Sequence, residues 1–562
     1  MKNKTFFYLF IILIISFLFR FWYIDKPEGL WNDEYVSWYI ASKNSFSEFI
    51  KYVSKNCHTP LYYIFLKFWL IIFPDTDVSL RISSVLMSIF TVIAMFFAGK
   101  EFKDNKTGML CAFFAAVSSF YIYFAQEVRL YSLLAFVSTL VMWTCIKLLK
   151  EGKKRYFALF IILNALLCAV HTLGIAFSFF IILFSIIYLY KNFDEWKLII
   201  KNFRETLKYI FPLLCVILLI SPFMFSILFS KTLSQFWSEF SFFKPLYVFI
   251  DYFSPVQCNI TNSPSLPDIY LFKEGKLNYF FIVFALIPSL IAFIAIIKAV
   301  LLKNKILNLL LYACLCFFAV TFMLSAVGKM ILLSKYISEI YPILILAFVS
   351  GILSFKQIQL RNIILFIYFG LSLLYLYYSP ESAPKIMRRE GNNLPVILIE
   401  QSRLKPNDFI ILTYYDKDKF ERYFKNINDY KIYSISKFNF NEHIFNNPNY
   451  YRTIKEGKSL YREQFKEFPN KNIINWTNNL VINMMPKGGK AGILYLDGVS
   501  FFSNETIQNI IADDYKYNKT SFVFLTFSML KNSLMYAFKD DFRQDSITQI
   551  GDWTLIVYEK IK

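Results

Sequence analysis

The segment YFFIVFALIPSLIAFIAIIKAVLLKNKILNLLLYACLCFFAVTFMLSAV, residues 279–327, indicates most directly what kind of fold this chain adopts. It contains two apolar runs, 279–299 and 306–327, which are separated by a turn with Lys303 and Lys305. About 20 helical residues cross the hydrocarbon core of a bilayer, so each run is long enough to span a membrane. The segment therefore predicts a transmembrane helical hairpin.

Similar apolar runs occupy most of the chain before residue 380. The 562 residues are 56% hydrophobic and only 18% charged, which excludes a soluble globular protein, a disordered chain and a collagen. Eight cysteines are too few for a disulfide scaffold of this length. We expect a polytopic α-helical membrane protein with about 11 transmembrane helices. The other runs lie at 6–24, 82–99, 109–125, 130–149, 156–171, 174–190, 209–229, 336–354 and 362–379.

The net charge of +20 is better explained by membrane topology than by a nucleic-acid partner. Short basic clusters separate the apolar runs, and such clusters remain on the cytoplasmic side. This places the N-terminus inside. The abundance of Phe, Ile, Lys and Asn is typical of a low-GC bacterium, so we expect a bacterial cytoplasmic membrane. The clusters are Lys2/Lys4, Lys100/Lys103/Lys106, Lys150/Lys153/Lys154/Arg155, Lys191/Lys197/Lys201/Arg204/Lys208, Lys298/Lys303/Lys305 and Lys356/Arg361.

All clusters share one side only if TPLYYIFLKFWLIIF, residues 59–73, does not cross the membrane. This run is short and carries Lys67 in its middle, so we interpret it as an interfacial helix within a first outer loop at 25–81. Residues 1–380 then form the transmembrane domain.

Residues 381–562 have a different character and are predicted to form an extracytoplasmic α/β domain. Helical stretches such as DKDKFERYFKN and NETIQNIIADDY alternate with short apolar segments of strand length. No GxGxxG or GxxxxGK loop occurs there, so no nucleotide cofactor is expected. The strand-like segments are DFIILT (408–413), YKIYSIS (430–436), AGILYLD (491–497), SFVFLTF (521–527) and WTLIVYE (553–559).

Asp33 and Glu34 are adjacent carboxylates directly after the first predicted span, in WNDEYVSWYIA at 31–41. Carboxylates are costly near lipid unless they are paired or functional. In a sugar transfer, a fixed carboxylate accepts the proton that the acceptor loses as it attacks the anomeric carbon. The alternative is a solvated acid pair at the start of a short helix that Asn32 caps.

Glu127 and Arg129 lie where two predicted spans turn at the outer face, in FAQEVRLYS at 124–132. Two charges so close to lipid suggest an aqueous cavity, in which Arg129 binds phosphate oxygens. The alternative is an ion pair between the two that only stabilises the turn. His171, at the next outer turn, follows the same reasoning more weakly.

Two further candidate sites lie in the predicted outer loops. His58, in NCHTPLYY at 56–63, suits phosphate or metal binding, or it is an ordinary surface residue. Cys57 either pairs with Cys258 or is a free thiol. In SKYISEIYPILIL at 334–346, Lys335 and Tyr336 end a late span, and Lys335 either snorkels to the interface or faces a lipid phosphate.

The ordered set of these motifs resembles the bacterial dolichyl-phosphate-mannose protein mannosyltransferase-like family, with the lipid A aminoarabinose transferases as more distant relatives. The resemblance covers most of residues 1–345. It rests on Asp33–Glu34, HTPLYY at 58–63, Arg81, GKEFKDNKTGML at 99–110, AQEVRLYS at 125–132, His171, and Lys335–Tyr336 followed by Pro342.

The resemblance implies a GT-C glycosyltransferase fold with interfacial helices in the first outer loop. It implies a polyprenyl-phosphate sugar donor, with undecaprenyl phosphate as the carrier, and inversion at the anomeric carbon. The extracytoplasmic acceptor is a protein, a lipid or a cell-envelope glycan. Two departures from the family pattern are Lys335, where arginine is usual, and Thr59, where proline is usual.

Roles for individual residues follow from matching positions. Asp33 is the expected catalytic base, with Glu34 supporting it and Glu127 as the second cavity acid. The donor phosphate is expected to contact His58, Arg129, Tyr131, Lys335 and Tyr336, with His171 and Arg81 as candidate cavity residues. Metal use varies among relatives, so a divalent ion (Mg, Mn or Zn) held by Asp33, His58 or Glu127 is left open.

Two other classes of function compete with a transferase. A transporter or flippase of lipid-linked sugars predicts charged residues near the bilayer centre and broken helices in paired halves. A noncatalytic envelope-assembly protein predicts that the tail domain binds glycan by itself.

Overall fold

The computed structural model describes residues 2–22, 24–25, 29–55, 59–229, 242–254, 272–273, 276–277, 285–327 and 331–378, and later residues 399, 404, 409–412, 422–423, 431–434, 490–496, 542–550 and 553–560. The chain forms two compact units. The first contains Met1–Asp25 and Val36–Ile386, and the second contains Lys26–Tyr35 and Met387–Lys562.

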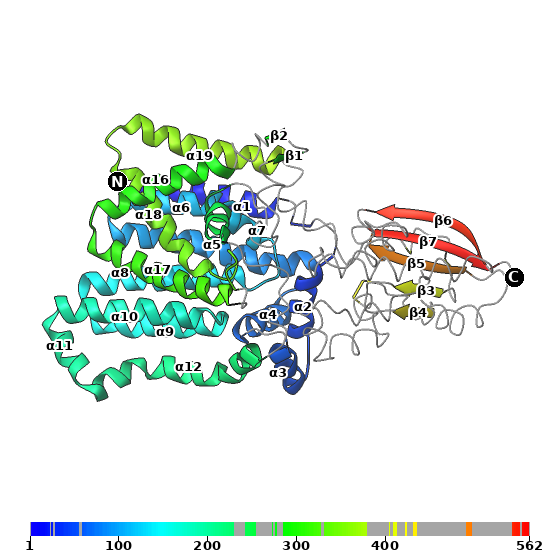
Figure 1. Ribbon diagram of the computed structural model, residues 1–562, viewed down its shortest axis with the longest axis horizontal. Coiled ribbons are helices and arrows are strands. Elements are labelled where there is room, and N and C mark those ends of the chain that lie inside the picture. Colours follow the sequence, from blue (N-terminus) through cyan, green and yellow to red (C-terminus); the bar gives the residue numbers. More distant parts are fainter. Residues whose placement is uncertain are drawn as a thin grey trace. The chain divides into compact units, whose positions relative to one another are not determined.

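Helices make up nearly all of the described part of the first unit (Figure 1). The helices among the described residues are α1 (Lys2–Phe21), α2 (Asn32–Ala41), α3 (Phe46–Lys55), α4 (Leu61–Ile72), α5 (Asp77–Phe102), α6 (Asn105–Val117), α7 (Ser119–Ala125), α8 (Tyr131–Glu151), α9 (Lys154–Val170), α10 (Gly174–Asn192), α11 (Asp194–Lys201), α12 (Phe203–Phe229), α13 (Lys244–Phe253), α16 (Ile287–Leu301), α17 (Lys305–Ala326), the 3-10 helix η4 (Ser338–Ile340), α18 (Tyr341–Ser354) and α19 (Ile358–Tyr378). Strands β1 (Phe272–Lys273) and β2 (Lys276–Leu277) pair antiparallel.

Six of the described helices are long and apolar enough to cross a membrane: α1, α5, α8, α10, α12 and α17. Helices α6 and α7 add a seventh if this pair, bent by 57°, counts as one span. The protein is therefore a multi-pass helical membrane protein, as the apolar runs predict. The other predicted spans coincide with α9, α16, α18 and α19. Over their described residues these helices are not both long and apolar enough to count as spans.

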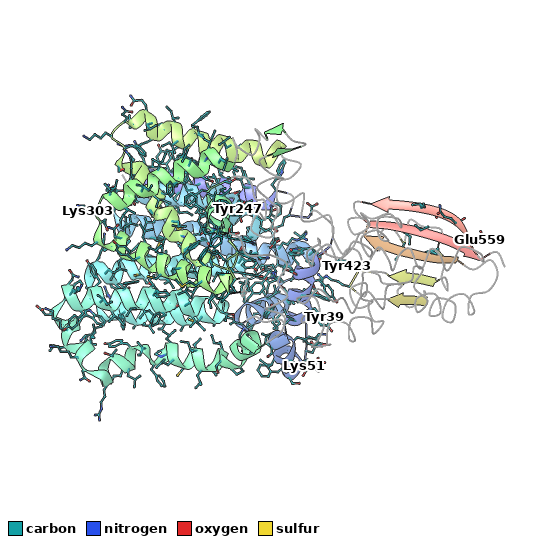
Figure 2. The ribbon with its side chains drawn as sticks, viewed as in Figure 1. Tyr39, Lys51, Tyr247, Lys303, Tyr423 and Glu559 are labelled. Atoms are coloured by element: carbon teal, nitrogen blue, oxygen red, sulfur yellow. The ribbon has the colours of Figure 1, made fainter. Side chains whose placement is uncertain are left out.

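The two ends of the first unit differ in the segments that they carry. The N-terminus, α11 and the α16–α17 turn with Lys303 lie at one end (Figure 1, Figure 2). Tyr39 of α2 and Lys51 of α3 lie at the opposite end (Figure 2). The separation agrees with the predicted division between basic turns and the first outer loop.

The motif at 99–110 forms a close helix crossing between α5 and α6. A β-carbon on Gly108 would lie 2.5 Å from the Phe96 carbonyl oxygen, so only glycine allows the two helices to approach this closely. Asp104 begins α6, because its Oδ1 accepts hydrogen bonds from the backbone N–H and hydroxyl of Thr107, both at 2.8 Å. This motif therefore has a structural explanation.

The second unit contains a five-stranded mixed sheet of order β4-β3-β5-β7-β6. Strands β4, β3 and β5 run parallel, whereas β7 is antiparallel to β5 and to β6. The buried Leu555, Ile556 and Val557 lie in β7. The strands are β3 (Phe409–Leu412), β4 (Lys431–Ser434), β5 (Lys490–Leu496), β6 (Phe542–Ile550) and β7 (Trp553–Lys560).

Four of the five predicted strand segments appear in this sheet as β3, β4, β5 and β7. Strand β6, FRQDSITQI, is not among the predicted segments, because it is largely polar and contains no apolar run. It is one of the two edge strands of the described sheet, where the backbone pairs with a neighbouring strand on one side only. The segment at 521–527 and the two predicted helical stretches lie outside the described residues, apart from a turn at Arg422–Tyr423.

Candidate functional site

The turn that carries Glu127 and Arg129 follows a broken helix, and Arg20 of α1 supports that break. The Arg20 guanidinium donates to the carbonyls of Ala115 at 2.9 Å and Ala116 at 2.8 Å, near the end of α6. These carbonyls belong to the last turn of the helix, where no intrahelical donor remains. A charge in an apolar span is thus used to stabilise the bend between α6 and α7.

Gln126 holds the same turn from the other direction. Its Nε2 donates to the carbonyls of Trp22 at 2.6 Å and Arg20 at 3.0 Å, at the end of α1. The Ser84 hydroxyl on α5 donates to the Glu127 carbonyl at 2.6 Å. The turn is therefore fixed to two neighbouring helices.

Arg129 lies beside Tyr131, which in turn is close to residues from a distant part of the chain. Its guanidinium carbon is 5.7 Å from the centroid of the Tyr131 ring at the start of α8. The electrostatic environment of the Tyr131 hydroxyl includes Arg129, Lys335 and Tyr336. Glu127 and Arg129 are only 4% and 7% exposed, so their charges act in a medium of low dielectric constant. Two predicted phosphate-binding segments thus meet within the first unit.

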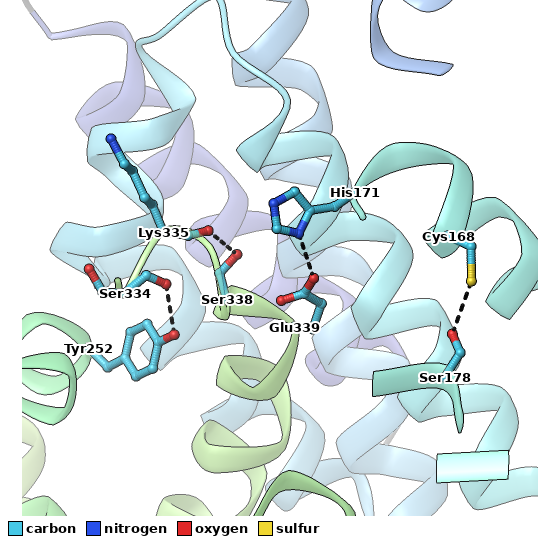
Figure 3. A network of polar contacts seen from close by, with 8 residues as sticks. All are labelled: Cys168, His171, Ser178, Tyr252, Ser334, Lys335, Ser338 and Glu339. Atoms are coloured by element: carbon cyan, nitrogen blue, oxygen red, sulfur yellow. Dashed lines mark hydrogen bonds and ion pairs between the residues drawn. The ribbon is translucent and has the colours of Figure 1, made fainter. Parts of the chain in front are cut away.

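His171 and Glu339 form a buried pair between the α9–α10 turn and η4. The His171 Nδ1 lies 2.9 Å from the Glu339 Oε1, and Glu339 is fully buried (Figure 3). The His171 ring also stacks on Tyr336, with centroids 6.2 Å apart and an interplanar angle of 29°. His171 is therefore buried next to the Lys335–Tyr336 segment.

Helix α13 supplies a second buried carboxylate close to this segment. The Ser334 hydroxyl donates to Asp251 Oδ2 at 2.7 Å, and the Tyr252 hydroxyl donates to the Ser334 carbonyl at 2.8 Å. Burial lowers the pKa of Lys244 to about 8, and the Asp251 carboxylate opposes this shift. The end of the loop between α17 and η4 is thus anchored from α13.

Asp33 and Glu34 lie in the first turn of α2, where the helix dipole stabilises negatively charged side chains. Glu34 is fully buried, and its Oε2 accepts a hydrogen bond from the Trp31 N–H at 3.1 Å. Asp33 is half-buried. Both residues belong to the second unit, whereas Arg129 belongs to the first, so their common pocket stays a prediction.

Arg81 and Lys67 have structural contacts in the first unit. Arg81 is fully buried, and its Nη1 donates to the Ile24 carbonyl at 3.1 Å. The Lys67 Nζ donates to the Ala41 carbonyl at 3.4 Å, at the end of α2. Lys67 thus caps the C-terminal end of α2, which explains why a lysine lies in the middle of the apolar helix α4.

No group of three or more His, Cys, Asp and Glu side chains within the described residues has a geometry that would hold a metal ion. Asp33 and Glu127 belong to this part of the chain. His58 lies outside the described residues, as do Cys57 and Cys258.

Glu339, Asp251 and Arg20 are not among the site residues predicted from the sequence. Arg20 ends an apolar run and resembles an ordinary terminal cation, and Asp251 lies in a short amphipathic segment. The signal for Glu339 was its position one turn after Lys335, in an otherwise apolar stretch. Such a buried carboxylate needs a partner, but the sequence does not identify His171 as that partner.

These features define a helical membrane protein with buried charges at the turns of its spans. Residues 57–227 match the family described as dolichyl-phosphate-mannose-protein mannosyltransferase, which belongs to the GT-C glycosyltransferases. The resemblance predicted from the sequence is confirmed over this region. No curated protein matches the chain.

The solved structures that the chain is similar to include proteins from Cupriavidus metallidurans and Archaeoglobus fulgidus. ArnT from Cupriavidus metallidurans, bound to undecaprenyl phosphate, is 10% identical with a TM-score of 0.46, and the match covers 99% of this chain and 98% of that one. The apo Archaeoglobus fulgidus oligosaccharyltransferase is 10% identical with a TM-score of 0.44, covering 89% and 70%. AglB from the same archaeon, in complex with an inhibitory peptide and a dolichol-phosphate, is 11% identical with a TM-score of 0.41, covering 77% and 64%.

Proposed function

We propose that the protein is an inverting glycosyltransferase that moves a sugar from a polyprenyl-phosphate donor to an extracytoplasmic acceptor. The observation that carries this proposal is that Tyr131 lies close both to Arg129 and to the Lys335–Tyr336 pair within the first unit. Two cations and two phenols close to one another, with Arg129 and Tyr131 buried and Lys335 and Tyr336 half-buried, suit a phosphate group at the membrane surface. The family match over residues 57–227 supports the same class of donor.

The proposed reaction is a single displacement. The acceptor oxygen or nitrogen attacks the anomeric carbon, and the bond from that carbon to the phosphate oxygen breaks from the opposite face. The electron pair leaves with the polyprenyl phosphate, and the acceptor proton passes to Asp33. Arg129 stabilises the charge that grows on the leaving phosphate more in the transition state than in the ground state.

The remaining candidates have supporting roles in this proposal. Glu34 holds the start of α2, which carries Asp33, by accepting a hydrogen bond from the Trp31 N–H. Glu127 is the second acid of the cavity, and His58 faces the donor phosphate. We further propose that 11 spans, as predicted, place this cavity and the tail domain on the extracytoplasmic side of a bacterial cytoplasmic membrane.

The first test is turnover by the purified full-length protein with an undecaprenyl-phosphate sugar and mixed envelope acceptors. We expect release of undecaprenyl phosphate together with a glycosylated product of inverted configuration. Asp33→Asn should abolish product while the elution volume and melting temperature match those of the wild type. Product formation by Asp33→Asn at the wild-type rate would reject Asp33 as the base.

The transporter alternative gains one specific observation, the 57° bend between α6 and α7. Broken helices line substrate sites in many transporters. Here the Arg20 guanidinium and the Ser118 N-cap satisfy the polar groups at the bend, so the break also has a structural explanation. A transporter would move the intact lipid-linked sugar across proteoliposomes and release no polyprenyl phosphate.

A further inference from the structure

The segment at 331–340 carries Lys335 and Tyr336, and buried side chains on other elements hold it at both ends. At its start, Ser334 is bonded to Asp251 and Tyr252 of α13. At its end, Glu339 is bonded to His171 of the α9–α10 turn (Figure 3). The position of Lys335 and Tyr336 therefore depends on elements far away in the sequence.

The contact between His171 and Glu339 is more than a generic packing contact. Burying a carboxylate is costly, and apolar side chains of similar volume commonly hold two elements together at least as well. Here Glu339 is fully buried, and its Oε2 has no hydrogen-bond partner among the described residues. A structure that only needed cohesion at this point would gain stability by losing the charge.

The direction of the side chains indicates how the pair acts. Lys335 extends away from Glu339 in Figure 3, so the carboxylate does not neutralise this lysine by direct contact. The His171 ring instead lies against Tyr336. The hydrogen bond between the His171 Nδ1 and the Glu339 carboxylate fixes the plane of the imidazole. The imidazole in turn limits where the Tyr336 ring can lie.

We propose that His171 and Glu339 are positioning residues that set Tyr336 and Lys335 for the phosphate of the lipid-linked donor. This inference rests on the proposed function, because it concerns the donor side of the same site. Neither residue needs to contact the donor. The pair holds the segment in place before the phosphate binds, so the segment loses less conformational entropy on binding. We therefore expect the pair to affect mainly the affinity for the donor.

The test compares variants that keep the bond with variants that remove it. His171→Asn retains a donor near the Nδ1 position and Glu339→Gln retains an acceptor, whereas His171→Leu and Glu339→Leu retain neither. We expect each leucine variant to raise the KM for the donor about tenfold with a smaller change in kcat. The Asn and Gln variants should stay within about threefold of the wild type. The double leucine variant should be no worse than either single one.

Ser178→Ala is a matched control, because Ser178 makes a buried polar contact with Cys168 beside the same turn but does not contact the segment at 331–340 (Figure 3). Its donor KM should equal that of the wild type. If the leucine variants do not fold, Glu339→Asp serves instead, since the shorter side chain displaces the carboxylate by about one bond length. It should raise the donor KM, and an unchanged KM would overturn the proposal.

The outcomes separate this inference from the proposed function. Wild-type turnover with unchanged donor KM in the leucine variants, or a loss confined to kcat, overturns the positioning role alone. Direct binding of undecaprenyl phosphate to the same variants gives a second measure, and its affinity should fall in parallel with the rise in KM. If the wild type neither turns over nor binds undecaprenyl phosphate, both the proposed function and this inference are wrong.

Discussion

Arg129 is the residue on which the phosphate assignment depends most. We expect Arg129→Ala to lower kcat/KM for the donor about 100-fold or more, because a buried charge-assisted contact to phosphate is lost. Arg129→Lys should recover part of this loss, since lysine keeps the charge but not the fork of donors. Steady-state kinetics at varied donor concentration measure both effects.

Arg129→Ala, compared with Glu127→Gln, decides between phosphate binding and a structural ion pair with Glu127. If the charges only stabilise the turn, Arg129→Ala and Glu127→Gln should lower the melting temperature by similar amounts and leave the donor KM unchanged. A donor KM that rises in Arg129→Ala alone would instead support the phosphate role.

Arg20 shows how a charge within an apolar span acquires a structural purpose. Arg20→Met removes the donors that serve Ser88, Ala115 and Ala116. We expect a loss of about 3 kcal/mol in the free energy of unfolding, since buried carbonyls lose their partners. Thermal unfolding in detergent should report it as a clear fall in melting temperature. Arg155→Met, at a basic turn, is the control and should change the melting temperature little.

At the scale of elements, close helix crossings set the geometry around the site. A β-carbon on Gly351 of α18 would lie 1.8 Å from the Ala295 carbonyl oxygen of α16, whereas one on Gly370 of α19 would meet nothing within 4 Å. The first crossing leaves no room for a methyl group, and backbone atoms cannot move aside cheaply.

We therefore expect Gly351→Ala to separate α16 from α18 and to lower the free energy of unfolding by roughly 2 kcal/mol or more. Gly370→Ala, the same change in an open position, should be neutral or slightly stabilising, because alanine is the better helix former. Melting temperatures of the two variants in the same detergent test this directly. Equal effects at both positions would contradict the crossing geometry.

At the scale of the whole molecule, the proposed function requires that the donor be used on the side opposite the basic turns. In reconstituted vesicles of mixed orientation, protease added outside should digest residues 387–562 only in molecules whose tail faces outward. We expect the turnover of externally added donor to be proportional to the fraction of molecules whose tail is digested. Turnover proportional to the protected fraction would contradict the predicted topology.

The membrane class, most helix positions and four strands of the tail sheet could be predicted from the sequence. Whether a segment enters the lipid depends on the length of its own apolar run and on the basic residues that flank it. Each run can therefore be recognised without knowledge of the segments that it packs against. The edge strand β6 could not be recognised in this way, because its polar sequence carries no such local signal.

The partners of the buried charged side chains could be identified only from the tertiary structure. Residue type alone indicated that Arg129, His171 and Lys335 belong near chemistry, because charges are costly beside lipid. Which carboxylate holds His171, and why Arg20 and Lys67 are tolerated among apolar residues, depends on contacts between segments distant in the chain. Such contacts arise when helices pack, and a linear pattern of residues contains no information about which of their faces meet.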